Sequence, residues 1–235
     1  MLEELKESVF KANLDLVDQG LVTLTWGNVS GIDREQGLVV IKPSGVPYDR
    51  MDPTQMVVVD LDGKRVEGDY NPSSDTPTHV LLYRQFQSIG GITHTHSSCA
   101  VMYAQARREI PCYGTTHADH FHGTVPLTRA LTADEVEADY EGNTGRVIIE
   151  RFAGIDAASM PAVLVAGHGP FSWGSTAQKS VENAVALEAV ARMAMGMMQI
   201  NSEATELESY VLDKHYQRKH GPTATYGQSS NTHLT

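Results

Sequence analysis

The stretch TPTHVLLYRQFQSIGGITHTH, residues 76–96, places a helix pattern directly before a strand pattern and so indicates the class of fold. Thr76–Phe86 is predicted to be a helix, with Pro77 in its first turn, where the missing N–H group costs little. Gly90-Gly91 breaks this helix, and Ile92–His96 is predicted to be a strand. Helices packed on a sheet, and hence an α/β domain, fit this pattern best.

Short apolar runs elsewhere in the chain predict further strands. They are rich in β-branched residues and are separated by Gly, Pro and Asp, as strands and turns require. Because the first three follow one another within residues 22–59, we expect hairpins and a sheet that is at least partly antiparallel. Further helices are predicted at residues 2–19, 176–200 and 203–218. The predicted strands are Val22–Leu24, Leu38–Ile41, Met56–Val59, Val147–Glu150 and Val163–Ala166.

No internal repeat or low-complexity linker divides the chain, so we predict one domain over residues 1–228 and a flexible tail at residues 229–235. The 41% hydrophobic and 20% charged fractions are those of an ordinary globular protein. A net charge of −11 argues against nucleic-acid binding, although a local basic pocket would still accept a small anion. The sequence begins with no signal peptide and holds no run of about 18 apolar residues. We therefore expect a cytoplasmic protein with no membrane partner.

Two histidines at the end of the predicted strand, His94 and His96, are the first candidate for a metal site. Residues two apart on a strand point to the same face, so the two imidazoles would project together. The alternative is a pair of exposed or hydrogen-bonded histidines. His168, between two glycines, and Asp75, at the start of the predicted helix, are further candidates, although Asp75 is equally well explained as an N-cap. Together these donors suit Zn²⁺ or a similar divalent ion.

Six motifs, in order, make the chain resemble the 4-epimerase members of the class II aldolase/adducin family from Met1 to about Gln228. Such a set is far more specific than one H-x-H pair. The resemblance implies a single-domain, three-layer α/β/α fold with a largely antiparallel central sheet flanked by helices. The motifs are LTWGNVS (24–30), KPSG (42–45), SSDTPTH (73–79), HTHS (94–97), GTTHAD (114–119) and KHYQRKHG (214–221).

The resemblance further implies one divalent ion per subunit, Zn²⁺ or another such as Mn²⁺ or Co²⁺, held by Asp75, His94, His96 and His168. Four protein ligands would fill a tetrahedral zinc ion, whereas a catalytic site needs an open position. We therefore expect either expanded coordination or a weakly held Asp75 that yields when substrate arrives.

The resemblance also assigns substrate and acid/base positions. Glycines permit close backbone approach, and serine hydroxyls and main-chain N–H groups donate to phosphate oxygens. Lys42 would add a compact positive charge, unless it is a surface lysine at a turn. Asp119 and Tyr226 match the acid/base positions, and the histidines at 117, 120 and 122 are expected to pack or to hydrogen-bond. The matching substrate-binding residues are Gly27, Asn28, Lys42, Ser44, Gly45, Ser73, Ser74, Thr115 and His215.

The implied activity is the interconversion of L-ribulose 5-phosphate and D-xylulose 5-phosphate, as in L-arabinose degradation, by metal-assisted retro-aldol cleavage and re-addition at C3–C4. Epimerisation needs acid/base groups on both faces of the reacting carbon, which is a reason to expect both Asp119 and Tyr226. The family also implies a homotetramer with active sites at subunit interfaces, where these two residues reach the metal of a neighbouring chain.

Two alternatives stay open. A class II aldolase would cleave a ketose 1-phosphate to dihydroxyacetone phosphate and an aldehyde, but the SSDTPTH and GTTHAD runs favour the epimerase. A non-enzymatic, adducin-like interaction module would keep the fold while losing metal ligands. The presence of all four ligand types weighs against that module.

Overall fold

The computed structural model describes residues 2–221 and residue 224, so the predicted tail at residues 229–235 lies outside the described residues. Its framework is one seven-stranded sheet in the order β4-β3-β2-β1-β5-β7-β6, with every pair of neighbouring strands antiparallel. The strands are β1 (Asn28–Asp33), β2 (Leu38–Ile41), β3 (Val57–Asp60), β4 (Arg65–Glu67), β5 (Gly91–His94), β6 (Ala162–Leu164) and β7 (Pro170–Gly174).

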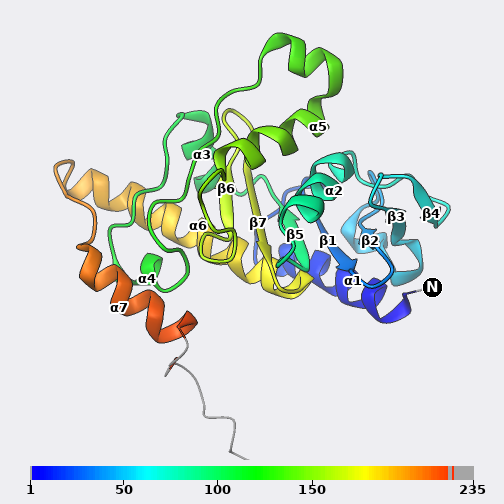
Figure 1. Cartoon of the computed structure of the whole chain (residues 1–235), viewed down its shortest axis with the longest axis horizontal. Helices are drawn as coiled ribbons and strands as arrows, with labels where there is room; N and C mark the ends of the chain where they lie inside the picture. Colours follow the sequence, from blue (N-terminus) through cyan, green and yellow to red (C-terminus); the bar gives the residue numbers. More distant parts are fainter. Residues whose placement is uncertain (1, 222–223, 225–235) are drawn as a thin grey trace, which may run out of the picture.

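Helices cover both faces of this sheet, which confirms the predicted three-layer α/β/α fold (Figure 1). α1 and the first half of α6 pack on one face, and α2, with α5 beside it, packs on the other. None of the helices in the described part of the chain has the length and apolarity needed to cross a membrane. The helices are α1 (Glu3–Asp18), α2 (Thr76–Gln85), α3 (Ser98–Gln105), α4 (Thr115–Ala118), α5 (Ala133–Arg151), α6 (Ala177–Ile200) and α7 (Ser209–His220).

Successive side chains along the central strands point to opposite faces of the sheet, and so contribute to two hydrophobic cores, one on each face. In β2, Val39 and Ile41 join the cluster that contains α2, whereas Val40 between them joins the cluster that contains α1. Val58 in β3 also faces α1. Full burial of each such side chain contributes about 1.5–3 kcal/mol, so the strands are held between two apolar layers.

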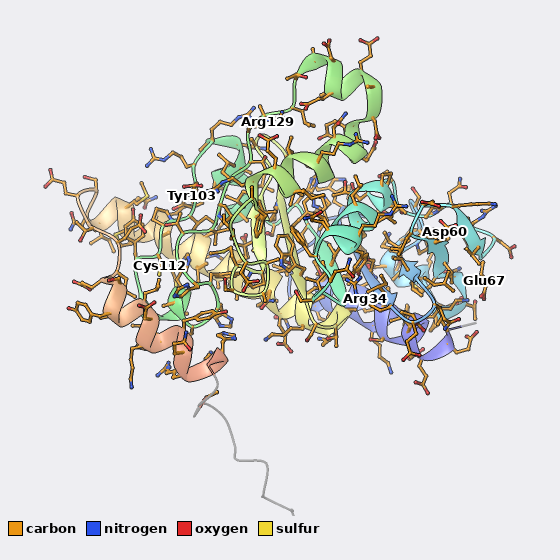
Figure 2. The ribbon with its side chains drawn as sticks, in the orientation of Figure 1. Arg34, Asp60, Glu67, Tyr103, Cys112 and Arg129 are labelled. Carbon is orange, nitrogen blue, oxygen red and sulfur yellow. The ribbon has the colours of Figure 1, made fainter. Side chains whose placement is uncertain are left out.

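Arg34, which follows β1, fixes the carboxyl end of α2 (Figure 2). Its guanidinium donates to the carbonyl oxygens of Tyr83 at 3.0 Å, Phe86 at 2.9 Å and Ile89 at 2.8 Å. A cation at this end of a helix is also favoured by the helix dipole. The contacts hold α2 in place on the β1–β2 hairpin, and Asp75 is the residue that precedes the other end of that helix.

Some predicted elements are confirmed and others are wrong. Leu38–Ile41 is β2, and the predicted helix Thr76–Phe86 ends one residue earlier than expected. Val147–Glu150 is not a strand, because its apolar residues form one side of α5 that packs against α2. Val22–Leu24 is a turn, in which Leu24 has a φ of 54° that no strand accommodates. The last helix begins at Ser209 rather than at residue 203.

Glu188, buried on α6, holds the start of α3. Its carboxylate accepts from the backbone N–H of Cys99 at 2.9 and 3.1 Å and from that of Ala100 at 3.0 Å. α3 has no side-chain cap of its own. Because Glu188→Ala leaves two buried donors unpaired, we expect the free energy of unfolding to fall by about 2–4 kcal/mol.

Urea unfolding at a fixed protein concentration measures this loss, and Glu182→Ala on the same helix is the control. Glu182 makes an exposed pair with Lys179, whose removal should change the free energy of unfolding by less than about 0.5 kcal/mol. Equal changes in the two variants would show that Glu188 does not cap α3.

Candidate metal centre

Three histidines from separate segments converge at one end of β5. His94 is the last residue of that strand and is buried, whereas His96, in the loop before α3, is exposed. The half-buried His168 lies in the turn between β6 and β7. One nitrogen from each ring lies within 4.8 Å of the others, and 3.1 Å separates Nε2 of His94 from Nε2 of His96. The three rings therefore present their nitrogens to one point.

The predicted strand Ile92–His96 is wrong in its last two residues, because β5 ends at His94. Alternation along a strand therefore does not orient His96. The chain turns after β5 to begin α3 at Ser98, and this turn brings the ring of His96 back to His94. The pair converges through the turn and not through strand geometry.

The state of these rings fits metal ligands. Nδ1 of His94 lies 2.9 Å from the carbonyl oxygen of Pro170, which only accepts, so Nδ1 carries a proton and Nε2 is the nitrogen that a metal would bind. Burial, and then the neighbouring His94, lower the pKa of His168 to about 4, so this ring is uncharged at neutral pH. Three imidazole nitrogens around one point fit a divalent ion that accepts nitrogen donors.

Asp75 lies at the N-cap position of α2 but makes no side-chain capping bond. Its Oδ2 instead accepts a hydrogen bond from Nδ2 of Asn28 at 2.6 Å. Burial alone would raise the pKa of Asp75, but His94, His79 and the bond from Asn28 outweigh it and hold the pKa below its ordinary value. Asp75 is not one of the donors that lie within 4.8 Å of one another. Its carboxylate is therefore ionised and stands outside the three-histidine group.

Asn28 leaves one buried atom without a partner. Its Oδ1 accepts no hydrogen bond from the described residues, although the side chain is almost completely buried. Asn28 is paired with His94 in the register of β1 and β5, so it lies beside the histidine cluster. A buried acceptor normally has a partner, and a donor group on a bound ligand would supply one.

Gly27, which directly precedes β1, lets the backbone there lie close to the end of β5. It has a φ of 105°, and a Cβ atom there would lie 2.9 Å from the carbonyl oxygen of His94. Tyr48 donates its hydroxyl proton to the carbonyl oxygen of Gly27 at 2.9 Å. Any side chain at Gly27 would push Asn28 away from the cluster.

The predicted phosphate-binding residues lie in two loops that contact each other. The backbone N–H of Ser73 donates to the carbonyl oxygen of Lys42 at 3.0 Å, and that of Ser44 donates to the carbonyl oxygen of Asn71 at 2.9 Å. The exposed residues of these loops include Ser44, Gly45 and Ser74. Gly45 has a φ of 67° and open space beside its α carbon. The loops thus offer the hydroxyls of Ser44 and Ser74 and the exposed backbone at Gly45 to an incoming anion.

Lys42 is not a surface lysine, because only 2% of it is exposed. Its Nζ donates to the carbonyl oxygens of Pro43 at 3.3 Å and Val46 at 3.0 Å and lies 4.8 Å from the centre of the Tyr48 ring. No carboxylate of the described residues pairs with it. Burial lowers the pKa of Lys42 to about 8. A buried ammonium group with no counter-ion, at the base of a glycine–serine loop, fits a phosphate.

Asp119 lies elsewhere in the chain. It follows α4, and its carboxylate accepts from Nη2 of Arg218 at 2.8 and 3.0 Å and from Nδ1 of His215 at 3.1 Å. Burial raises the pKa of Asp119, but Arg218 and His215 lower it by more. No hydrogen bond or ion pair between described residues joins Asp119 to the histidine cluster, and α4 and α7 lie together at the left of Figure 1. Thr115, the first residue of α4, is exposed in the same region.

Tyr226 lies outside the described residues. His117 and His122 make the expected hydrogen bonds, with Nε2 of His117 donating to Gly123 O at 2.8 Å and Nε2 of His122 2.8 Å from Asp213 Oδ1. Neither ring belongs to the histidine cluster.

Tyr140 is a neighbour of the cluster that the sequence did not indicate. Its hydroxyl lies 3.4 Å from Nδ1 of His168. The helix leaves helical geometry at Asp139 (φ −169°, ψ 82°), and the following turn carries Tyr140. Poor helix formers follow the kink, namely Gly142, Asn143, Thr144 and Gly145. They weaken the helix pattern, but no local signal places Tyr140 beside His168.

The comparisons with known proteins agree on one family. The sequence model of the family described as Class II Aldolase and Adducin N-terminal domain matches residues 7–195 of this chain. The chain is 55% identical over 227 residues to L-ribulose-5-phosphate 4-epimerase UlaF of Salmonella paratyphi B, a match that covers 97% of this chain and 100% of that protein. The same identity and coverage hold for UlaF of Salmonella paratyphi A.

Solved structures show the same fold at much lower identity. An L-fuculose 1-phosphate aldolase is 24% identical, with a TM-score of 0.77, and the match covers 92% of this chain and 95% of that one. YgbL from Escherichia coli, a putative aldolase/epimerase/decarboxylase, is 22% identical with a TM-score of 0.73, covering 90% of this chain and 97% of that one.

Proposed function

The chain belongs to the class II aldolase and adducin family, and we infer that it is an epimerase that interconverts L-ribulose 5-phosphate and D-xylulose 5-phosphate. The observation that carries this inference is the 55% identity, over 97% of the chain, to proteins with that activity in their names. The three-histidine cluster supports it, because carbon–carbon cleavage beside a ketone in this family uses a divalent ion. The substrates fit a pentose route such as L-arabinose degradation in the cytoplasm.

The donor set fits one Zn²⁺ per subunit, held by His94, His96 and His168, with Asp75 as a weaker fourth ligand. Mn²⁺ and Co²⁺ accept the same nitrogen and oxygen donors. When bound, such an ion supplies Lewis-acid polarisation of the ketone carbonyl and the adjacent hydroxyl. Asp75 lies outside the group of donors that are within 4.8 Å of one another, which agrees with a weakly held fourth ligand.

The remaining residues would orient the substrate. Lys42 and the two adjoining loops would hold its phosphate, and the unpartnered Oδ1 of Asn28 would accept from a sugar hydroxyl near the cluster. One of the pair Asp119 and Tyr226 would take the proton of the C4 hydroxyl as the C3–C4 bond breaks. The two-carbon aldehyde would then turn, and the other residue would return a proton as the bond forms on the opposite face.

The position of Asp119 supports an assembly of several chains. Within one chain Asp119 lies with His215 and Arg218 on the α4–α7 corner, and no described contact links this corner to the histidines. A cyclic homotetramer would let this corner of one chain complete the metal centre of the next. Thr115 and His215 would then contact substrate from the neighbouring chain.

Product analysis distinguishes this function from its alternatives. Incubation of the metal-loaded protein with L-ribulose 5-phosphate should give D-xylulose 5-phosphate without accumulation of free fragments. A class II aldolase would release the two fragments instead. A non-catalytic interaction module would give no product and would purify without stoichiometric metal.

The pKa of Lys42 predicts a pH dependence of substrate capture. A lysine is charged below its pKa, so its positive charge disappears as the pH rises through about 8. We therefore expect kcat/KM to fall above that pH by about tenfold per unit, as loss of a single proton requires. Lys42→Arg stays charged, so this limb should move to higher pH even if the maximum is lower. A wild-type profile that stays flat to about pH 10 would contradict the phosphate role of Lys42.

A further inference from the structure

A chain of three buried polar side chains lies behind Asp75, between β1 and α2. The hydroxyl of Ser30 lies 2.7 Å from Nδ1 of His79 and 2.8 Å from the hydroxyl of Tyr83. All three residues are completely buried. The other ring nitrogen of His79, Nε2, has no hydrogen-bond partner among the described residues. A buried nitrogen without a hydrogen-bond partner lowers the stability of the fold, so the unpaired Nε2 of His79 needs an explanation.

Two side-chain hydrogen bonds, called rungs below, join β1 to α2 at matching positions. Asn28 and Ser30 are two apart on the strand and point to the same face, while Asp75 and His79 are four apart on one side of the helix. Asn28 bonds Asp75, and Ser30 bonds His79. Two strand residues rise about 7 Å and four helical residues about 6 Å, so the two rungs run nearly parallel. The ring of His79 thus lies one helical turn from Asp75 on the side of α2 that bonds β1.

Proton counting selects one tautomer of His79. If Nδ1 carried the proton, Nε2 would keep a buried lone pair with no donor, in the field of the Asp75 carboxylate, whose charge acts on His79. If Nε2 carries the proton, Tyr83 donates to Ser30, Ser30 donates to Nδ1, and each hydroxyl proton has an acceptor. The second arrangement also aligns the bonds in one direction, which strengthens each of them. It leaves an N–H donor at Nε2.

We propose that His79 is a positioning residue that donates its Nε2 proton, through one bridging water, to the Asp75 carboxylate and so orients Asp75 toward the histidine cluster. Asn28 holds the carboxylate from β1, and His79 would hold it from α2. Outer partners of this kind fix the orientation of ligands, and their loss commonly weakens metal affinity by about 10–100-fold. The inference rests on the proposed function, because it assumes that Asp75 is a metal ligand.

The test compares His79→Leu with His79→Gln in Co²⁺ titrations of the metal-free protein, followed by visible absorption. Leucine removes the donor, whereas the amide of glutamine places an N–H group near the position of Nε2. We expect His79→Leu to weaken Co²⁺ binding by about 10–100-fold and to change the absorption spectrum. His79→Gln should stay within a few-fold of the wild type. Thermal unfolding of the metal-free proteins separates a loss of fold from a loss of ligand orientation.

Ser30→Ala gives a second route to the same answer if His79→Leu does not fold. Without the hydroxyl, Nδ1 loses its hydrogen-bond donor and only the Asp75 carboxylate favours the proton on Nε2. Co²⁺ binding should therefore weaken in the same direction, but by less than in His79→Leu. The role of His79 would be overturned if a folded His79→Leu or Ser30→Ala variant kept the Co²⁺ affinity and the absorption spectrum of the wild type. It would also be overturned if leucine and glutamine at position 79 weakened Co²⁺ binding equally. If the wild-type protein itself binds no Co²⁺, the metal centre of the proposed function fails, and this inference fails with it.

Discussion

Replacing His96 by asparagine is expected to lower kcat/KM for epimerisation by about a thousandfold or more. His96 is the exposed member of the cluster, and its Nε2 lies 3.1 Å from that of His94. Asparagine is too short to bring a donor to the same point. A Lewis acid is worth several kcal/mol to the transition state, and each 1.4 kcal/mol is a factor of ten in rate. The measurement is kcat/KM together with the metal content per subunit.

Loss of metal and loss of rate should occur together in His96→Asn, while the circular dichroism spectrum stays that of the wild type. Excess Zn²⁺, Mn²⁺ or Co²⁺ should restore part of the activity if the variant still binds metal weakly. Full turnover with one firmly bound ion per subunit would remove His96 from the ligand set.

Asp119→Asn is expected to lower kcat by about 10²- to 10⁴-fold, the range for loss of a general acid or base. The amide has the same shape as the carboxylate but cannot take up a proton. Because metal and phosphate are bound by other residues, KM should change much less than kcat. Steady-state kinetics gives both values. An unchanged kcat would assign the carboxylate to the ion pair with Arg218 alone.

A mixing experiment tests whether Asp119 acts across a subunit interface. His96→Asn and Asp119→Asn chains, each nearly inactive alone, are co-expressed so that they assemble together. If one chain supplies the ion and the next supplies Asp119, random assembly restores about one quarter of the sites. If Asp119 serves its own chain, no chain in the mixture has both groups, and no activity returns.

The fold could be predicted from local patterns where those patterns agree with the tertiary structure. The valine-rich run of β2 is buried on both faces and forms the expected strand. Val147–Glu150 has a similar composition but follows a capped helix start at Thr132, some 15 residues earlier, and packs against α2. A short apolar run does not by itself distinguish a strand from one turn of a buried helix.

The sequence predicts which types of residue form the candidate site, but it does not predict their contacts. Histidine and aspartate donors can be recognised by type and by motif. The bond from Asn28 to Asp75 joins residues 47 apart, and no pattern in the chain predicts it. The same is true of Asp119, whose partners on α7 come from about 100 residues further along the sequence.

Epimerisation by carbon–carbon cleavage is tested most directly with L-ribulose 5-phosphate that carries deuterium on C4. Breaking the C3–C4 bond leaves this deuterium on the aldehyde carbon, and re-addition returns it to the sugar. With the metal-loaded wild type in ordinary water, we expect D-xylulose 5-phosphate that retains deuterium at C4. Loss of the deuterium to water, accumulation of free fragments, or the absence of D-xylulose 5-phosphate would contradict the proposed function.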